Sequence, residues 1–460
     1  MGAAMRSETE SGRAAARALL GGARAGFGGV RPPDLPGAWT AFDEEVRRVH
    51  SRSYPPPPGT RLETRLCDPD GHVREAALRD PKAPLPLVAI RCADWVPAVR
   101  DLARQVLAGA LAADPGRTLT ALVPLVLRLG RREQGGWALE LFDTALRAKE
   151  PVLAPWARPA RPARWGRPAR WGRPARPART LTGEVPDTVM AWLRRSGDLQ
   201  VRRYAARLTL ESGQFGVREL ARRAAVESDP LTSRLWAEAA MAAMAADGPD
   251  GGPDDEAVDT LLGGHVPMVR ACGVTALRRA GRAAEAARHL TDRSALVRAC
   301  ARWAVKQAGG DPYALCRELI EDPERVFPYA VTGFAECAGR ADAPLLRALL
   351  DHPAGAVRAA ALAGLRPLEG PVDVERLLPL LDDPSASVAR EAALCLLSSA
   401  VRLDAAPLEA RLGADRPAHT RRAAFRLLRA RGGAAALRAS RALARDPDPS
   451  LRALALGPGG

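Results

Sequence analysis

Residues 374–400 read VERLLPLLDDPSASVAREAALCLLSSA, and this stretch predicts two helices joined by a tight turn. Leucines line one side of its first half, and Asp383-Pro384 then ends that helix, because proline cannot continue a helix and restricts the residue before it. In the second half, apolar residues recur every four positions on one helical face, namely Val388, Ala392, Leu396 and Ala400. One such pair cannot bury its apolar face alone, so neighbouring pairs must stack.

The same pattern recurs along the chain about every thirty residues. We align the copies on one position near the start of each second helix, usually apolar and usually followed by a basic residue, and call it the anchor. The anchors are Val73, Val99, Val201, Ser233, Val269, Val297, Val326, Val357, Val388, Thr420 and Leu451. Their spacing is 26 to 36 residues, apart from a gap of 102 residues after Val99. This regularity predicts an array of stacked helical hairpins.

Composition agrees with a helical array. The chain is 47% hydrophobic but only 4% aromatic, so its core is built mainly from Ala, Leu and Val. Strands favour the β-branched and aromatic residues, of which the aromatic ones are scarce here, whereas alanine and leucine favour helices. We therefore predict an all-α fold.

Three copies carry a recognisable signature: CDPDGHVREAA (67–77), DHPAGAVRAAA (351–361) and DPSASVAREAA (383–393). They resemble the short bacterial HEAT repeats whose pattern is D-P-x-x-x-V-R-x-A-A, a type related to the repeats of phycobilin lyases. The resemblance covers about residues 62–456 and implies an α-solenoid of roughly twelve or thirteen hairpins. The whole chain is also similar to actinobacterial HEAT-repeat proteins of unassigned role. Such repeats serve scaffolds, adaptors and several kinds of enzyme, so the resemblance implies no mechanism.

The resemblance also implies a role for the arginine after the anchor. In HEAT arrays this arginine commonly pairs with an acidic residue in the loop of a neighbouring repeat, and the pairs form a ladder. A binding site rarely needs the same residue in every repeat, so we interpret this pattern as structural. The structural positions are Val73, Arg74, Val99, Arg100, Val269, Arg270, Val297, Arg298, Val357, Arg358 and Val388.

Five segments follow from these patterns. Residues 1–60 carry no repeat and are predicted to be largely irregular and disordered, with one short amphipathic helix at 38–50. Residues 61–150 and 183–456 are two blocks of repeats, and 457–460 form a tail. Between the blocks, residues 151–182 form a low-complexity loop rich in Arg, Pro and Trp, which we also predict to be disordered.

Within that loop, residues 158–179 read RPARPARWGRPARWGRPARPAR, with an arginine at every third position. Its prolines exclude a helix and favour polyproline II, whose three-residue turn aligns the arginines on one edge. Guanidinium groups bind phosphates and indoles stack on bases. The candidate polyanion-binding residues are Arg158, Arg161, Arg164, Trp165, Arg167, Arg170, Trp171, Arg173, Arg176 and Arg179. The alternative is that the tandem ARWGRP units arose by replication slippage in a GC-rich gene and bind nothing.

The sequence offers little catalytic chemistry. It contains no HExxH, Walker A or GxSxG pattern, and its six histidines are dispersed, so we predict a non-enzymatic protein without cofactor or metal. One enzymatic interpretation comes from HEAT-like DNA glycosylases, in which tryptophans and an acidic residue face the DNA. The candidates here are Trp95 with Asp94 or Asp101, and Trp137, Trp192, Trp236 and Trp303. Trp236 and Trp303 occupy positions that are apolar in other repeats, so we predict that both pack in the core.

Seven cysteines without any CxxC pair indicate free thiols in a reducing compartment, and no apolar run is long enough to span a membrane. We therefore expect a cytoplasmic scaffold that holds a protein partner in a concave groove lined by the second helices. The alternative is a nucleic-acid-binding protein, with or without glycosylase activity, since the net charge is +15. Nothing in the sequence indicates the oligomeric state.

Deletion of residues 155–179 tests the arginine segment. If it binds polyanions, its removal weakens binding in gel-shift titrations and lowers the slope of log affinity against log salt, because fewer counterions are released. An unchanged affinity and slope would contradict this role.

Overall fold

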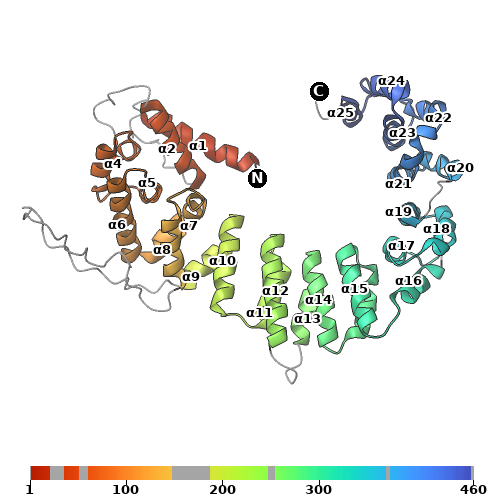
Figure 1. Ribbon diagram of the computed structural model, residues 1–460, viewed down its shortest axis with the longest axis horizontal. Coiled ribbons are helices and arrows are strands. Elements are labelled where there is room, and N and C mark those ends of the chain that lie inside the picture. Colours follow the sequence, from red (N-terminus) through yellow and green to blue (C-terminus); the bar gives the residue numbers. More distant parts are fainter. Residues whose placement is uncertain are drawn as a thin grey trace, which may run out of the picture. The chain divides into compact units, whose positions relative to one another are not determined.

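The computed structural model describes residues 2–20, 36–50, 61–147, 187–246, 254–322, 324–368 and 373–456. All regular secondary structure in these ranges is helical and none of it is strand, which confirms the predicted all-α fold (Figure 1). The chain divides into two compact units, Met1–Gly216 and Val217–Gly460. None of the helices in the described ranges is long and apolar enough to cross a bilayer.

Unit 1 is built from helices packed in succession, with α4 and α5 against α6 and with α7 against α5 and α8–α10. Its helices are α1 (Gly2–Leu20), α2 (Pro36–His50), α3 (Leu62–Leu66), α4 (Gly71–Leu78), α5 (Leu85–Arg91), α6 (Pro97–Ala113), α7 (Pro115–Leu129), α8 (Gly136–Arg147), α9 (Asp187–Arg194) and α10 (Leu199–Ser212).

The N-terminal segment is more ordered than the sequence predicts. In place of one short helix at 38–50 it has two, α1 and α2, which pack along each other. Ala16 and Phe42 are buried, and Arg17 pairs with Glu45 at 2.8 Å. α2 also contacts α5 and α7, so these helices cover the first repeats. The prediction is wrong here because it relied on the repeat pattern, which α1 and α2 lack.

Helices α9 and α10 belong to unit 1, although the sequence assigns them to the second block of repeats. They pack against α7, and Arg128 of α7 lies 3.4 Å from the carboxylate of Asp198. Tyr204 of α10 donates to Asp143 of α8 at 2.5 Å. These polar contacts fix α10 to the helices that precede residues 151–182.

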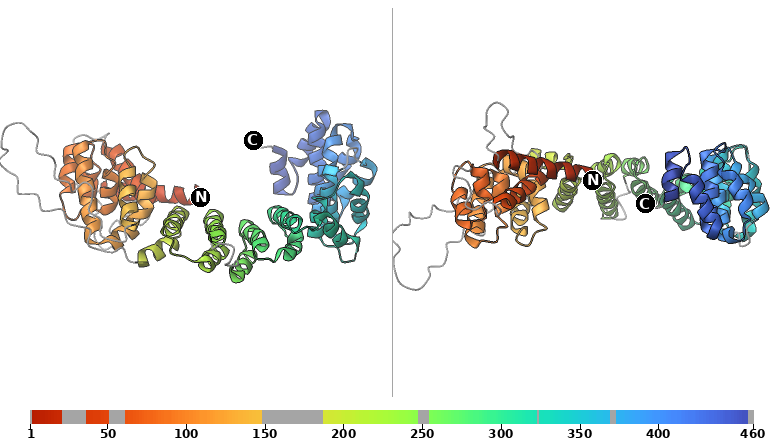
Figure 2. Two further views of the ribbon diagram at one scale, coloured as in Figure 1. Left: turned by 60° about the horizontal axis from the view of Figure 1, so that its bottom comes forward. Right: turned by 90° about the horizontal axis from the view of Figure 1, so that it is seen from above.

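Unit 2 is a longer series of hairpins that follow one another in chain order (Figures 1 and 2). Its helices are α11 (Val217–Val226), α12 (Pro230–Ala246), α13 (Asp255–Leu262), α14 (Pro267–Arg279), α15 (Ala295–Gln307), α16 (Pro312–Glu321), α17 (Pro328–Ala335), α18 (Ala343–Ala348), α19 (Gly355–Leu368), α20 (Val374–Leu377), α21 (Ala386–Leu396), α22 (Ala405–Glu409), α23 (Ala418–Arg431), α24 (Gly433–Leu443) and α25 (Pro449–Leu456). The 3-10 helices are η2 (Ala283–Thr291), η3 (Arg340–Asp342), η4 (Leu349–Asp351), η5 (Pro379–Asp382), η6 (Leu397–Arg402) and η7 (Ala410–Leu412).

The anchors lie where the repeat pattern predicts. From Val99 to Leu451 every anchor is buried, including the polar Ser233 and Thr420, whereas Val73 in the first copy is only half-buried. Each anchor lies at or just before the start of a second helix, and the second helices α17, α19, α21 and α23 contact one another in succession. The sequence period therefore corresponds to one packed hairpin.

The stretch 374–400 shows one difference from the predicted pair of helices. Its second helix, α21, buries Val388 and Ala392 completely. Its first half is broken into the short α20 and the 3-10 helix η5, which begins at Pro379. Pro379 has no backbone N–H to donate to the preceding turn, which removes one helical hydrogen bond and favours a break there. Leu377 and Leu381 are nevertheless both buried.

In several repeats the arginine after the anchor ties the repeat to the next one. Nη1 of Arg358 donates to the carbonyl oxygens of His352 and Pro353, in the turn before its own helix, at 2.7 and 2.9 Å. Its Nε and Nη2 donate to the carboxylate of Asp383, in the following turn, at 3.0 and 2.7 Å. Asp383 also accepts from the backbone N–H of Ser385 at 2.7 Å. One carboxylate thus shapes its own turn and holds the preceding repeat.

The same geometry recurs in both units, in the pairs Arg74–Asp94, Arg270–Asp292 and Arg421–Asp446. Arg298 pairs instead with Glu336, which follows α17 and does not lie in the turn before it. The chain of contacts continues where the next arginine donates to the carbonyl of the same aspartate, as Arg298 does to Asp292 at 2.6 Å and Arg452 to Asp446 at 2.7 Å. We call these contacts the arginine ladder.

Arg100 departs from the ladder. It donates to the carbonyl of Asp94 at 3.1 Å, but the one carboxylate in ion-pair range among the described residues is Asp101 of its own helix, 4.0 Å away. The turn that corresponds to the other ladder turns lies between α7 and α8 and contains Glu133, which forms no ion pair with Arg100 among the described residues.

Replacing a ladder arginine should destabilise the stack. Arg421 and Asp446 are both buried, so Arg421→Met leaves an unpaired buried carboxylate, which costs about 3 kcal/mol of unfolding free energy. Arg429→Met, on the exposed side of the same helix, should cost less than about 0.5 kcal/mol. Urea unfolding followed by circular dichroism measures both. Equal losses in the two variants would contradict a special role for the ladder.

Candidate functional site

The ten candidate polyanion-binding residues of segment 158–179 lie outside the described residues. The ladder arginines are placed, and their donors are already used. All three guanidinium nitrogens of Arg74, Arg270 and Arg358 donate within the protein. These arginines therefore hold the repeats together, and any ligand-binding surface is formed by residues outside the ladder.

The tryptophans fall into two classes. Trp236 is buried, as predicted. Trp303 is 41% exposed, so its predicted place in the core is wrong. It follows the anchor Val297 by six residues, which turns it about 240° around the helix, away from the buried face. The guanidinium of Arg278, on the neighbouring α14, lies 5.6 Å from the Trp303 ring centroid.

Trp95 does not form a site with a free carboxylate. It is 62% exposed, and the guanidinium carbons of Arg47 and Arg74 lie 4.5 and 4.6 Å from its ring centroid. Asp94 beside it is buried and bound by Arg74 as part of the ladder. Asp101 is exposed on α6. The other two tryptophans are spread over unit 1: Trp137 is half-buried in α8, and Trp192 is 43% exposed in α9.

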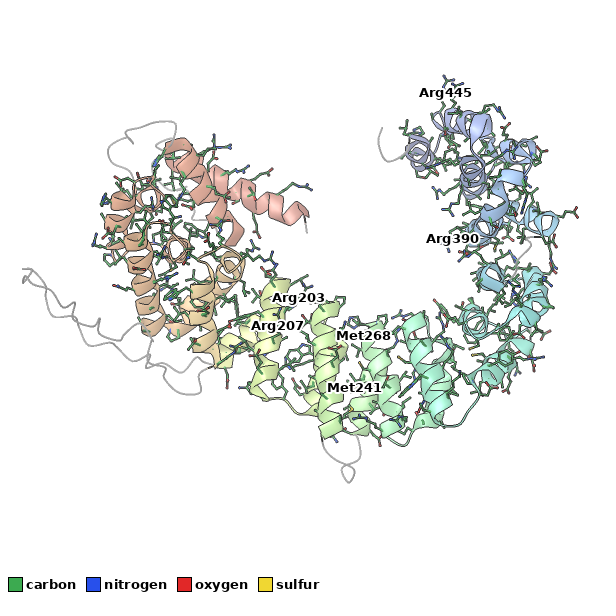
Figure 3. All side chains as sticks on the ribbon, viewed as in Figure 1. Arg203, Arg207, Met241, Met268, Arg390 and Arg445 are labelled. Carbon is green, nitrogen blue, oxygen red and sulfur yellow. The ribbon has the colours of Figure 1, made fainter. Side chains whose placement is uncertain are left out.

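A row of apolar side chains lies on the exposed side of three successive second helices. At about 100° per residue, the positions one before, three after and six after the anchor share the side away from the core. In α14, α15 and α17 these positions include Met268, Leu296, Trp303 and Tyr329, which we call the apolar strip. Leu296, Trp303 and Tyr329 are 41%, 41% and 47% exposed. Met268, labelled in Figure 3, is half-buried.

The helices that carry the apolar strip are joined in series. α14 packs directly on α15. Glu336, just after α17, pairs with both Arg298 and Arg302 of α15. Single exposed apolar residues are ordinary, but their recurrence at related positions of linked helices marks a candidate interaction surface.

A basic cleft opens between α21 and α23. Its volume is about 340 Å³, and its walls carry three arginines and one histidine but no carboxylate. It is lined by Ala386, Ser387, Arg390, His419, Arg422, Ala423 and Arg426. Arg390 is labelled in Figure 3.

The cleft arginines do not follow the repeat pattern. The position two after the anchor is alanine or proline in α14, α15, α17 and α19, but it is Arg390 in α21 and Arg422 in α23. Six after the anchor, only α23 among the second helices of unit 2 has an arginine, Arg426. The sequence analysis did not predict this cleft. The arginines that lie outside the ladder position would have indicated it.

Contacts within the protein satisfy the cleft arginines only in part. Arg390 donates to Glu391, a buried carboxylate below the cleft, at 2.8 Å. Arg422 donates to the hydroxyl of Ser450 at 2.5 Å. Arg426 is half-buried and has no hydrogen-bond or ion-pair partner among the residues that the structure describes.

Unit 1 has a comparable cleft of about 330 Å³ beside α10. Arg203 and Arg207 take the same positions relative to Val201 that Arg422 and Arg426 take relative to Thr420 (Figure 3). This cleft differs in charge, because its lining includes Asp143 and Glu211. Basic groups there have acidic neighbours, and the cleft of unit 2 is the more strongly positive of the two.

Two cysteines of unit 2 form a hydrogen-bonded pair. The Cys316 thiol bonds to the sulfur of Cys337, and this bond, with the charges of Arg302 and Lys306, lowers the pKa of Cys337 to about 7. Burial raises the pKa of Cys272 to about 11. In the described ranges no cluster of three or more His, Cys, Asp or Glu side chains could hold a metal ion.

Cys337 should be the more reactive of these thiols. The thiolate is the nucleophile, so alkylation by iodoacetamide should rise with pH through about 7 at Cys337 and only near pH 11 at Cys272. Both residues are half-buried, which makes Cys272 an internal control. Peptide mass spectrometry measures both rates, and equal rates at neutral pH would contradict the assignment.

No protein-family model matches the sequence, and no curated protein matches it. The function of the apolar strip and of the basic cleft is therefore inferred from the side chains that form them.

Proposed function

We propose that the chain is an α-solenoid of about twelve or thirteen HEAT-like repeats and acts as a non-catalytic scaffold or adaptor. In this proposal a protein partner binds the concave side formed by the second helices, where the apolar strip contacts it. The buried anchors and the arginine ladder support the repeat assignment. All seven cysteines are free, which favours a reducing compartment such as the cytoplasm.

The observation that carries this proposal is the chemistry of the apolar strip. Centres of protein–protein interfaces are enriched in aromatic residues and methionine and poor in charged residues. Trp303 and Tyr329 supply exposed aromatic rings, and Leu296 and Met268 supply aliphatic surface beside them. Nucleic-acid interfaces are strongly basic, and none of these four residues carries a positive charge.

Nucleic-acid binding is the second candidate, because the cleft between α21 and α23 carries three arginines without a lining carboxylate. If the protein is a DNA glycosylase, it also needs a catalytic carboxylate near an exposed tryptophan, and that carboxylate must not be held in an ion pair. Asp94 is held by the ladder, which leaves Asp101. Release of an alkylated base by the purified protein tests this activity directly, and its absence would exclude it.

Truncation of the apolar strip tests the scaffold proposal. Wild-type protein and a Leu296→Ser/Trp303→Ala variant are immobilised and used to capture proteins from an extract of the native host. Loss of a central aromatic contact typically costs about 2 kcal/mol, which is roughly thirtyfold in affinity, so the variant should lose the partner.

The matched control is Val401→Ser/Leu437→Ala, which changes exposed apolar residues outside the second helices. This control should capture the partner as wild type does. If the strip variant captures the same proteins in the same amounts as wild type, the scaffold surface has been assigned wrongly.

A further inference from the structure

The arginines of the cleft between α21 and α23 are not part of the arginine ladder, although Arg422 also reaches the hydroxyl of Ser450 on α25. Ladder arginines recur from repeat to repeat and are saturated, whereas Arg390, Arg422 and Arg426 occupy positions that are mostly small or uncharged elsewhere in unit 2. Arg390 is compensated by Glu391 and Arg422 lies near Asp448, but Arg426 is half-buried and has no partner in the described part of the chain. The cleft therefore holds more positive than negative charge, which a ligand carboxylate would offset.

We propose that this cleft binds an acidic segment of the protein partner, with the partner's carboxylates pairing with Arg390, Arg422 and Arg426. This inference rests on the proposed scaffold function and specifies the partner's chemistry at a second surface of the same unit. Guanidinium groups suit this task because each can offer two parallel N–H donors to one carboxylate.

The position of the cleft adds to its positive potential. It lies at the N-terminal ends of α21 and α23, since Ala386 and Ser387 open α21 and His419 is the second residue of α23. Helix N-termini carry partial positive charge and favour anions nearby. Arginine charge and helix termini therefore act in the same direction.

The lining favours a polypeptide over nucleic acid. Its non-basic residues are Ala386, Ser387 and Ala423, all small, and the two alanines offer apolar surface to aliphatic parts of a peptide. It contains no aromatic ring, which single-stranded nucleic acids use for base stacking. The adjoining α19 presents Ala356, Ala360 and Ala363 on its corresponding side, so the cationic positions do not continue there along a phosphate backbone.

The test uses the full chain and a short glutamate-rich peptide that carries a fluorophore and a photo-crosslinker. Its glutamine counterpart and a single-stranded oligonucleotide of equal net charge serve as comparison ligands. We expect crosslinks to map to α21 and α23. We also expect Arg422→Gln/Arg426→Gln to weaken binding of the acidic peptide about tenfold or more.

The control variant is Arg441→Gln/Arg445→Gln, which removes the same charge from exposed positions of unit 2 and should bind the peptide as wild type does (Figure 3). Thermal melts establish that both variants are folded. Equal binding by the cleft variant and wild type, or crosslinks confined to 158–179, would overturn the proposal. Tighter binding of the oligonucleotide through the same arginines would overturn it in favour of nucleic acid. Failure of the scaffold function itself would show instead as unchanged capture by the apolar-strip variant.

Discussion

The stacking of many repeats depends on one recurring interaction, an arginine of one repeat bound to a carboxylate in the turn of the next. Each hairpin is built largely from alanine and leucine and has little core of its own, so it is stable only against its neighbours. The ladder makes that contact specific. In Asp383 a single carboxylate receives Arg358 and the backbone of its own turn, so the turn and the stacking are set together. Burial raises the pKa of Asp292, but hydrogen bonds from Arg270 and Ser294 outweigh this effect and lower it, which keeps the ladder carboxylate ionised.

The ladder also provides a criterion for telling residues that stabilise the fold from residues available to bind a partner. An arginine that recurs at the same position and has all its donors used is explained by packing. An arginine, tryptophan or tyrosine that departs from the repeat at an exposed position has no such explanation. In unit 2 these departures fall into two groups, the apolar strip on α14, α15 and α17 and the basic cleft between α21 and α23. A partner with an apolar segment and an acidic segment would match both.

Much of the fold follows from the sequence because the repeat imposes a period that can be counted. The buried anchors, the all-α architecture and the arginine–carboxylate pairs are all local or nearest-neighbour features. The prediction and the structure differ where the repeat period says nothing about the local conformation or packing. α1 and α2 pack without any repeat signature, and Pro379 converts the end of a predicted helix to 3-10 geometry. The apolar character of Trp303 predicts a place in the core, but its rotation of about 240° around the helix from Val297 turns it outward. The basic cleft was missed because its arginines lie outside the repeated positions and come together only when α21 packs against α23.

The central claim is that the arginine and carboxylate of neighbouring repeats are energetically coupled, and a double-mutant cycle measures this most directly. Unfolding free energies of wild type, Arg358→Met, Asp383→Ala and the double variant give the coupling between the two side chains. We predict a coupling free energy above about 1 kcal/mol, because each side chain loses its ion-pair partner once the other is removed. Effects that add to within about 0.5 kcal/mol would show that the pair does not hold the repeats together.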